Sequence, residues 1–187
     1  AVMYSLDSIG DIDQDGYEDF VSGAPSAINN GVKVGSVTIY SGVDGSILHT
    51  FFGDSSEGFF GYSVSGAGDV DRDEFPDIVV GAISEGKSYI YSGKTGQLIK
   101  EIVRDNDANS FGSSVTGLIA SNGLSYVAIA AHLGGATREG LVDMYMSQPD
   151  MDGDNIADIF DDDDDGDGLT DSYEIGIGSN IRNVDTD

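Results

Sequence analysis

The first 148 residues alternate between short apolar runs and clusters of Gly, Asp, Asn and Ser, without the spacing of an amphipathic helix. DIVVGA is largely apolar, as in a strand covered on both faces, whereas SYIYSG alternates as in a strand with one exposed face. SGKTG is suited to closing a hairpin. The pattern predicts an all-β fold, and the clearest unit should contain strands at about 60–66, 77–83, 88–92 and 98–103.

This pattern recurs about every 50 residues. VTIYSGVDGSILHTF (37–51) reappears as SYIYSGKTGQLIKEI (88–102), and FFGYSVSGAGD (59–69) reappears as SFGSSVTG (110–117). A weaker third copy, LVDMY, ends at Tyr145. Length differences fall in the Gly- and Asn-rich connectors, as expected for repeated supersecondary units. Repeats of four short strands favour propeller-like blades, with units at about 1–59, 60–110 and 111–148.

Three units cannot close a propeller, and the third lacks an obvious fourth strand before Pro149. Open sheet edges tend to pair with other strands. We therefore expect that the blades are completed either by repeats outside this chain or by another copy of it, as a homo-oligomer or filament.

Each of the first two units contains a loop with carboxylates on alternate residues, DIDQDGYED (11–19) and DVDRDEFPD (69–77). Alternate residues of a tightly curled loop point the same way, and Ca²⁺ takes six to eight oxygen ligands. Positions one, three, five and nine would supply carboxylates, and position seven its backbone carbonyl. The predicted ligands are Asp11, Asp13, Asp15, Tyr17 and Asp19 in the first loop and Asp69, Asp71, Asp73, Phe75 and Asp77 in the second.

Position six differs between the two loops. Gly16 permits a positive φ there, but the second loop has Glu74. The third unit has no carboxylate at the corresponding place and should bind no metal. The alternative is a pair of acidic hairpin turns without an ion, because Asp and Gly are common in turns.

The stretch FFGYSVSGAGDVDRDEFPDIVVGA resembles the FG-GAP repeat of integrin α-subunits and many bacterial surface proteins. SIGDIDQDGYEDFVSGAP (8–25) matches the later half of that motif, but Val2 and Met3 replace its leading FG. The resemblance covers about residues 1–147. It implies a β-propeller, commonly of seven blades, with calcium in both acidic loops.

After Pro149 the chain becomes strongly acidic, and its aspartates again fall on alternate positions. DDDGDGLTDSYE (163–174) fits the EF-hand loop pattern in full, including the final glutamate. The predicted ligands are Asp150, Asp152, Asp154, Ile156, Asp158 and Asp161, followed by Asp163, Asp165, Asp167, Leu169, Asp171 and Glu174. A solvated acidic linker is the alternative.

The sequence shows no evident helices beside these two loops, and residues 151–180 resemble thrombospondin type 3 repeats. That resemblance implies that 149–187 is an irregular segment wrapped around calcium, giving about four or more ions in the whole chain. The final VDTD resembles the start of another such loop, so we expect the chain to be a piece of a longer protein.

Composition limits the partners of the chain. With 34 acidic against eight Lys and Arg residues the formal net charge is −26, which opposes binding to nucleic acid or to an anionic membrane. Self-repulsion of this size favours bound cations. The chain has no cysteine, and no apolar stretch is long enough to insert in a membrane.

We expect no enzymatic activity, because His49 and His132 occupy a repeated strand and a connector, and no nucleophile motif is present. The sequence predicts a calcium-stabilised extracellular module of a surface or adhesion protein, secreted and bacterial, with an unidentified protein or glycan ligand. The alternative is a non-catalytic targeting appendage of a secreted hydrolase.

Overall fold

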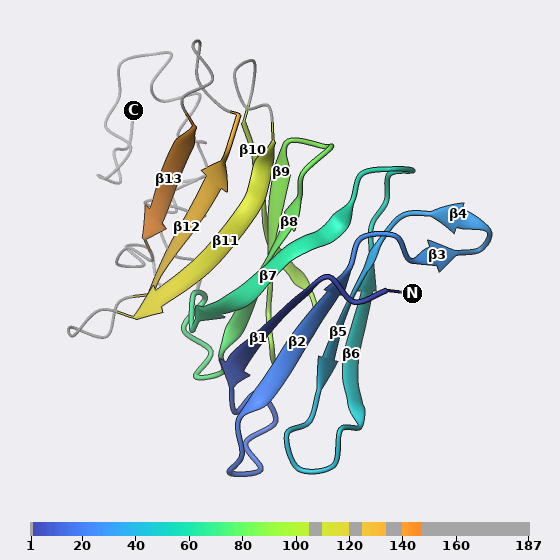
Figure 1. Ribbon diagram of the computed structural model, residues 1–187. Coiled ribbons are helices and arrows are strands. Elements are labelled where there is room, and N and C mark those ends of the chain that lie inside the picture. Colours follow the sequence, from blue (N-terminus) through green and yellow to red (C-terminus); the bar gives the residue numbers. More distant parts are fainter. Residues whose placement is uncertain (1, 105–109, 120–124, 134–139, 147–187) are drawn as a thin grey trace, which may run out of the picture.

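A computed structural model of the chain describes residues 2–104, 110–119, 125–133 and 140–146. These residues form strands and turns, with no helix among them (Figure 1). The first part contains β1 (Ser5–Gly10), β2 (Asp19–Ala24), β3 (Ile28–Asn29), β4 (Val32–Lys33), β5 (Ser36–Tyr40) and β6 (Ile47–Phe52). It is followed by β7 (Phe60–Gly68), β8 (Asp77–Ala82), β9 (Lys87–Tyr91), β10 (Leu98–Val103), β11 (Phe111–Ile119), β12 (Ser125–Ala131) and β13 (Leu141–Met146).

The strands form three main antiparallel sheets, which we name blades 1 to 3. Blade 1 has the order β1-β2-β5-β6, blade 2 has β7-β8-β9-β10, and the described part of blade 3 has β11-β12-β13. A short ribbon of β3 and β4 lies in the connector between β2 and β5. The all-β prediction and the four strands of the second unit are thus confirmed, and the three sheets do not form a closed barrel.

The blades stack face to face, and the first strand of each blade lies beside that of the next. β7 packs against β1 on one side and against β11 on the other (Figure 1). The strands fan outward from this central row, as in an arc of a propeller. Arg104, after β10, forms an ion pair with Asp143 of β13, which ties the outer part of blade 2 to blade 3.

Two apolar cores fill the spaces between neighbouring blades. The core between blades 1 and 2 contains Val21, Val37 and Ile39 from one side and Phe60, Ile78 and Val80 from the other. The core between blades 2 and 3 contains Val79, Ile90 and Ile102 opposite Phe111, Val127 and Ile129. Because successive side chains on a strand point to opposite faces, Val79 and Val80 contribute to different cores.

The phenylalanines of the repeated FG pair explain why this motif begins a blade. Phe60 and Phe111 are almost fully buried, and each lies in the core shared with the preceding blade. The glycines that follow, Gly61 and Gly112, have φ values of +80° and +78°, a region that favours glycine. The described residues contain no helix long and apolar enough to cross a membrane.

Candidate metal centre

The first acidic loop joins β1 to β2 at one end of blade 1. One carboxylate oxygen from each of Asp11, Asp13 and Asp15 lies within 4.8 Å of the other two. The backbone amide of Asp15 donates to Asp11 Oδ1 at 3.0 Å, and that of Gly16 donates to Asp11 Oδ2 at 2.8 Å. The amide of Tyr17 donates to Asp15 Oδ1 at 2.9 Å. The loop therefore curls around its own carboxylates and brings positions one, three and five together.

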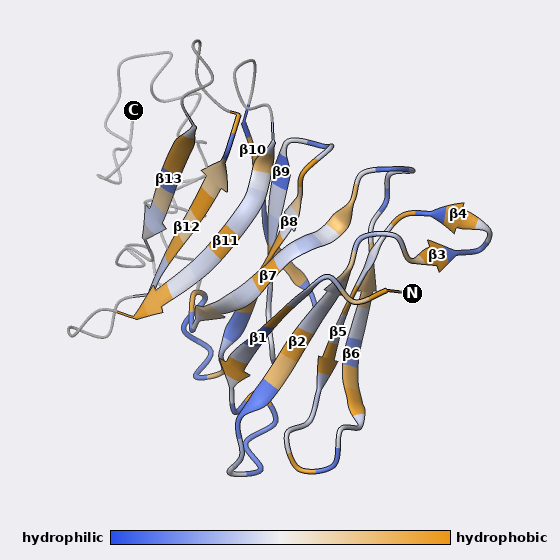
Figure 2. Cartoon of the chain, in the orientation of Figure 1, coloured by the Kyte–Doolittle hydropathy of each residue, from blue (hydrophilic) through white to orange (hydrophobic). Residues whose placement is uncertain are grey.

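The second acidic loop, between β7 and β8, repeats this arrangement in blade 2. The amide of Glu74 donates to Asp69 Oδ2 at 3.1 Å, and that of Phe75 donates to Asp73 Oδ1 at 3.0 Å. Here the carboxylates that approach within 4.8 Å of one another are those of Asp69, Asp71 and Asp77. Figure 2 shows the hydrophilic loop between β1 and β2 at the lower end of blade 1.

Both loops use the left-handed backbone region at positions four and six. Gln14 and Arg72 occupy position four, with φ values of 57° and 62°. At position six Gly16 has a φ of 93° and Glu74 a φ of 71°. The glutamate in the second loop thus keeps the curl of the first, at the conformational cost of a side chain in this region.

In both loops the aspartate at position nine accepts hydrogen bonds from backbone amides of its own loop and of the next hairpin of the blade. Asp19 accepts the amide of Ile12 at 2.8 Å through Oδ2 and that of Gly42, in the β5–β6 turn, at 2.9 Å through Oδ1. Asp77 similarly accepts the amides of Val70 at 2.6 Å and Gly93 at 3.2 Å. Spacing alone predicted these two residues as ligands and did not reveal that they join each loop to the next hairpin of its blade.

The negative charges of the carboxylates in the second loop are poorly balanced by the protein in the absence of a cation. Asp77 is fully buried, and burial together with the nearby Asp71 raises its pKa to about 8. Burial also raises the pKa values of Asp69 and Asp71, and the Oδ1 atom of Asp69 is buried without a hydrogen-bond partner. Lys94 gives only partial compensation, because its Nζ lies 3.9 Å from Asp73 Oδ2.

These observations fit a hard divalent cation. The clustered donors are all carboxylate oxygens, which suit Ca²⁺. A buried oxygen without a partner is costly unless a cation or a donor satisfies it. Where Ca²⁺ binds, it would neutralise the clustered carboxylates, and the residues of the chain would hold and orient the loop around it. The carbonyl oxygens of Tyr17 and Phe75 remain predicted ligands.

Comparison with known families identifies the repeated unit that carries these loops. The family model named FG-GAP repeat matches residues 4–40 and 60–97. Both stretches are similar to this repeat. Each match begins at the first strand of a blade and ends close to its β5–β6 or β9–β10 turn, so it includes one acidic loop.

Several integrin alpha subunits are similar in sequence to this chain. Integrin alpha-V of Gallus gallus is 32% identical over 158 residues, covering 76% of this chain and 15% of that protein. Integrin alpha-5 of Xenopus laevis is 32% identical over 165 residues, covering 78% and 15%. Integrin alpha-3 of Cricetulus griseus is 39% identical over 89 residues, covering 43% and 8%. The chain therefore spans about one seventh of the length of the first two relatives.

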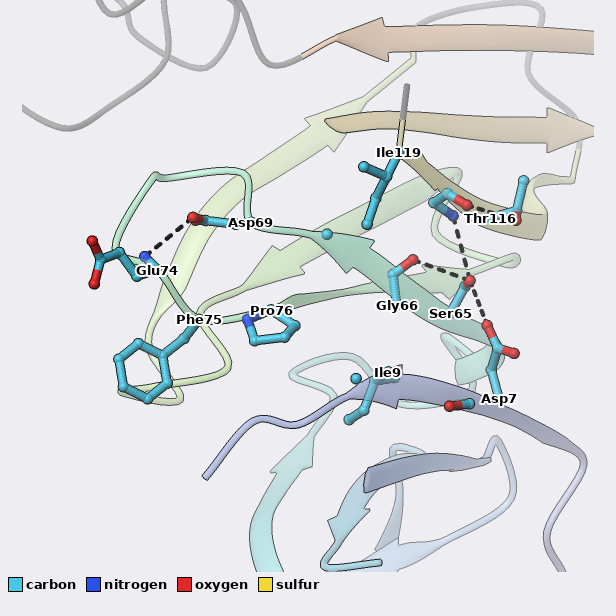
Figure 3. A pocket seen from close by; sticks show the side chains of 14 residues that line it. Asp7, Ile9, Ser65, Gly66, Asp69, Glu74, Phe75, Pro76, Thr116 and Ile119 are labelled. Carbon is cyan, nitrogen blue, oxygen red and sulfur yellow. Dashed lines mark hydrogen bonds between the residues drawn. The ribbon is translucent and has the colours of Figure 1, made fainter. Parts of the chain in front are cut away.

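A groove of about 560 Å³ lies where the first strands of the three blades meet the second FG-GAP loop. Figure 3 shows Asp7, Ser65 and Thr116 on successive strands, with Asp69 and Glu74 at one end. Ser65 Oγ donates to Asp7 Oδ2 at 2.6 Å and accepts the amide of Gly117 at 3.3 Å. This contact joins β1, β7 and β11 and was not foreseen from the sequence.

The remaining predicted ligands lie outside the described residues. They are Asp150, Asp152, Asp154, Ile156, Asp158, Asp161, Asp163, Asp165, Asp167, Leu169, Asp171 and Glu174. The same holds for the acid-free turn of the third unit at 120–124. These assignments, including the resemblance to thrombospondin type 3 repeats, stay predictions.

Proposed function

We propose that this chain is a calcium-stabilised extracellular module of an adhesion or surface-structural protein, without catalytic activity of its own. The observation that carries the proposal is the recurrence of one acidic loop, with the same internal hydrogen bonds, at the same place in two FG-GAP blades. Turn propensity alone gives no reason for clustering carboxylates in both loops, or for burying Asp69 Oδ1 in the second loop without a hydrogen-bond partner.

A location outside the cell is supported by the relatives and by the chemistry of the loops. Integrin alpha subunits are 32% identical to this chain over 158 and 165 residues, and calcium modules of extracellular proteins commonly bind at about 10⁻⁴–10⁻³ M. Cytosolic calcium is too scarce to fill sites of that affinity. The ligand of the module would be a protein or a glycan bound through the surface of the blades.

Native mass spectrometry of the whole chain in calcium tests the metal assignment. We expect at least about four ions if the predicted C-terminal loops also bind, according to the number of loop patterns. Asp11→Asn and Asp69→Asn should each remove one ion, because each takes a carboxylate from a different cluster. Asp44→Asn is the matched control, since this acid lies in the β5–β6 turn and accepts a bond from Ser46 there.

Thermal unfolding gives an independent readout. At a calcium concentration of about 100 times the dissociation constant, each site should stabilise the fold by roughly 2.7 kcal/mol. Removal of calcium from the two described loops should therefore lower the melting temperature by about 11–22 °C, at about 2–4 °C per kcal/mol. An ion count unchanged in both loop variants, together with a melting temperature insensitive to chelator, would refute the proposal.

A further inference from the structure

The two interfaces between blades share one close backbone contact. A Cβ atom added to Gly23 of blade 1 would lie 2.1 Å from the carbonyl oxygen of Gly61 in blade 2. A Cβ atom added to Gly81 of blade 2 would likewise lie 2.1 Å from the carbonyl oxygen of Gly112 in blade 3. Real Cβ atoms essentially never approach another heavy atom to less than 3.0 Å, so both contacts require glycine.

A serine completes each of these contacts. Ser5 Oγ donates to the Gly61 oxygen at 3.2 Å, and Ser63 Oγ donates to the Gly112 oxygen at 2.8 Å. Each serine is the cross-strand partner of the close-contact glycine in its own blade. Blades 1 and 2 therefore present a Ser–Gly pair that receives a glycine carbonyl from the blade that follows.

Blade 3 keeps the serine of this pair and lacks the glycine. In the register of β11 and β12, Ser114 is paired with Ala130, as Ser63 is paired with Gly81 in blade 2. Ala130 lies between the buried Ile129 and Ala131, so its methyl group points to the opposite face of the sheet. This outer face of blade 3 is equivalent to the face of blade 2 that packs against blade 3.

The methyl group occupies the place that the carbonyl oxygen of a further blade would need. At the observed spacing the separation would be 2.1 Å, so the blade would have to retreat by about 0.9 Å to reach 3.0 Å. A gap of about 0.5–1 Å already loses a quarter to a half of the dispersion attraction between facing atoms. The loss would extend along the whole apolar interface.

We propose that Ala130 ends the stack of blades. The outer face of blade 3 does not accept a further FG-GAP blade, from this protein or from a second copy, in the geometry of the other two interfaces. The face is otherwise suited to burial, because the apolar side chains of Leu118, Val142 and Met144 are 49%, 65% and 59% exposed. Ala130 is therefore the feature that discriminates against a blade.

Head-to-tail pairing of two copies meets a second obstacle on blade 1. Met3 precedes Ser5 by two residues, as Gly61 precedes Ser63, so it holds the place of the glycine that supplies the carbonyl. Its side chain would oppose the left-handed backbone that Gly61 adopts. Edge pairing along β13 involves different groups and does not depend on Ala130.

Two substitutions test the proposal in the whole chain with calcium present: one adds a methyl group to an interface between blades, and the other removes the methyl group of Ala130. Gly81→Ala places the methyl in the occupied interface and should force blade 3 away from blade 2. Amide hydrogen exchange in β12 should then become at least about tenfold faster. Ala130→Gly, the matched control, removes the methyl from the open face and should leave this exchange within about twofold of the original. Unchanged exchange in Gly81→Ala would show that the interface tolerates a methyl and would overturn the proposal.

A cross-linking experiment tests the open face directly and does not depend on the folding of Gly81→Ala. The chain has no cysteine, so Val142→Cys and Phe20→Cys each introduce one thiol, on the outer faces of blades 3 and 1. Mixed disulfides between the two proteins should form no faster than between Val142→Cys and Asp44→Cys, where Asp44 lies in an exposed turn. Selective cross-linking of residues 142 and 20 would show head-to-tail stacking and would overturn the proposal.

Discussion

Replacing Ile12 by alanine should weaken the packing of blade 2 on blade 1 and so destabilise the fold, although Ile12 belongs to an acidic loop. Ile12 is position two of that loop, between Asp11 and Asp13, and its side chain is 3% exposed. It lies in the core shared by blades 1 and 2, and its Cδ1 atom lies 2.9 Å from the place of a Cβ atom on Gly93. The carboxylates on either side of it belong to the candidate ion site, so the loop joins the ion to the core.

The expected loss follows from the buried carbons. Truncation to alanine removes about three methyl or methylene groups, worth roughly 2.4 kcal/mol at about 0.8 kcal/mol each. The cavity left behind raises the cost of such replacements to about 2–5 kcal/mol. We expect about 3 kcal/mol, which corresponds to a fall of about 6–12 °C in the melting temperature of a chain of this size.

The assay is thermal unfolding in saturating calcium, followed by circular dichroism. Ile47→Ala is the matched control, because Ile47 is 63% exposed on β6 and the same truncation should cost less than about 0.5 kcal/mol. If Ile12→Ala melted within about 1 °C of Ile47→Ala, Ile12 would not anchor the interface and the reasoning would be wrong.

Two further predictions concern the acidic loops. Glu74→Gly should stabilise the chain by about 1 kcal/mol in urea unfolding, because glycine adopts the φ of 71° without the steric cost of a side chain. Gly16→Ala should destabilise the chain by a similar amount, because the φ of Gly16 is 93°, although no neighbour lies within 4 Å of the added methyl group. Equal effects of the same sign in the two variants would contradict this reasoning. Since the pKa of Asp77 is raised from 3.8 to about 8, the protonated form is favoured by folding, and the calcium-free protein should lose stability as the pH rises from about 4 to 8. Urea midpoints at about pH 5 and pH 8.5 should show this loss without calcium but not in Asp77→Asn, and a pH dependence equal in both proteins would exclude Asp77 as its origin.

Strand positions followed from local patterns and were predicted closely. The expected strands of the second unit, at about 60–66, 77–83, 88–92 and 98–103, differ by at most two residues at each end from β7 to β10. Alternation of apolar residues and Gly-bearing turns is a local property, so it can be recognised without the neighbouring blades. The β3–β4 ribbon was missed, because two-residue strands at Ile28–Asn29 and Val32–Lys33 are too short to show alternation.

Contacts between blades could not be predicted in the same way. The repeated GA motif gave no indication that Gly23 and Gly81 face carbonyl oxygens of the next blade, since that depends on the distance between sheets. The candidate site was predicted in part: the alternate aspartates do converge, but spacing could not show that Asp19 also holds the β5–β6 turn. An aspartate at position nine would be needed either to bind a cation or to hold the turn, so the sequence does not distinguish the two roles.

The two loops also explain why so acidic a chain can keep apolar cores beside its charges. Successive residues of the loop point in opposite directions, so Asp11 and Asp13 gather on one side while Ile12 enters the core on the other. Val70 does the same between Asp69 and Asp71, and lies in the core of blades 2 and 3. Repulsion among the carboxylates would straighten the loop and withdraw the apolar residue, whereas a bound cation would hold both in place. In this arrangement each bound ion would stabilise the contact with the following blade as well as its own loop, so the stacking of blades would depend on the chemistry of the preceding loop.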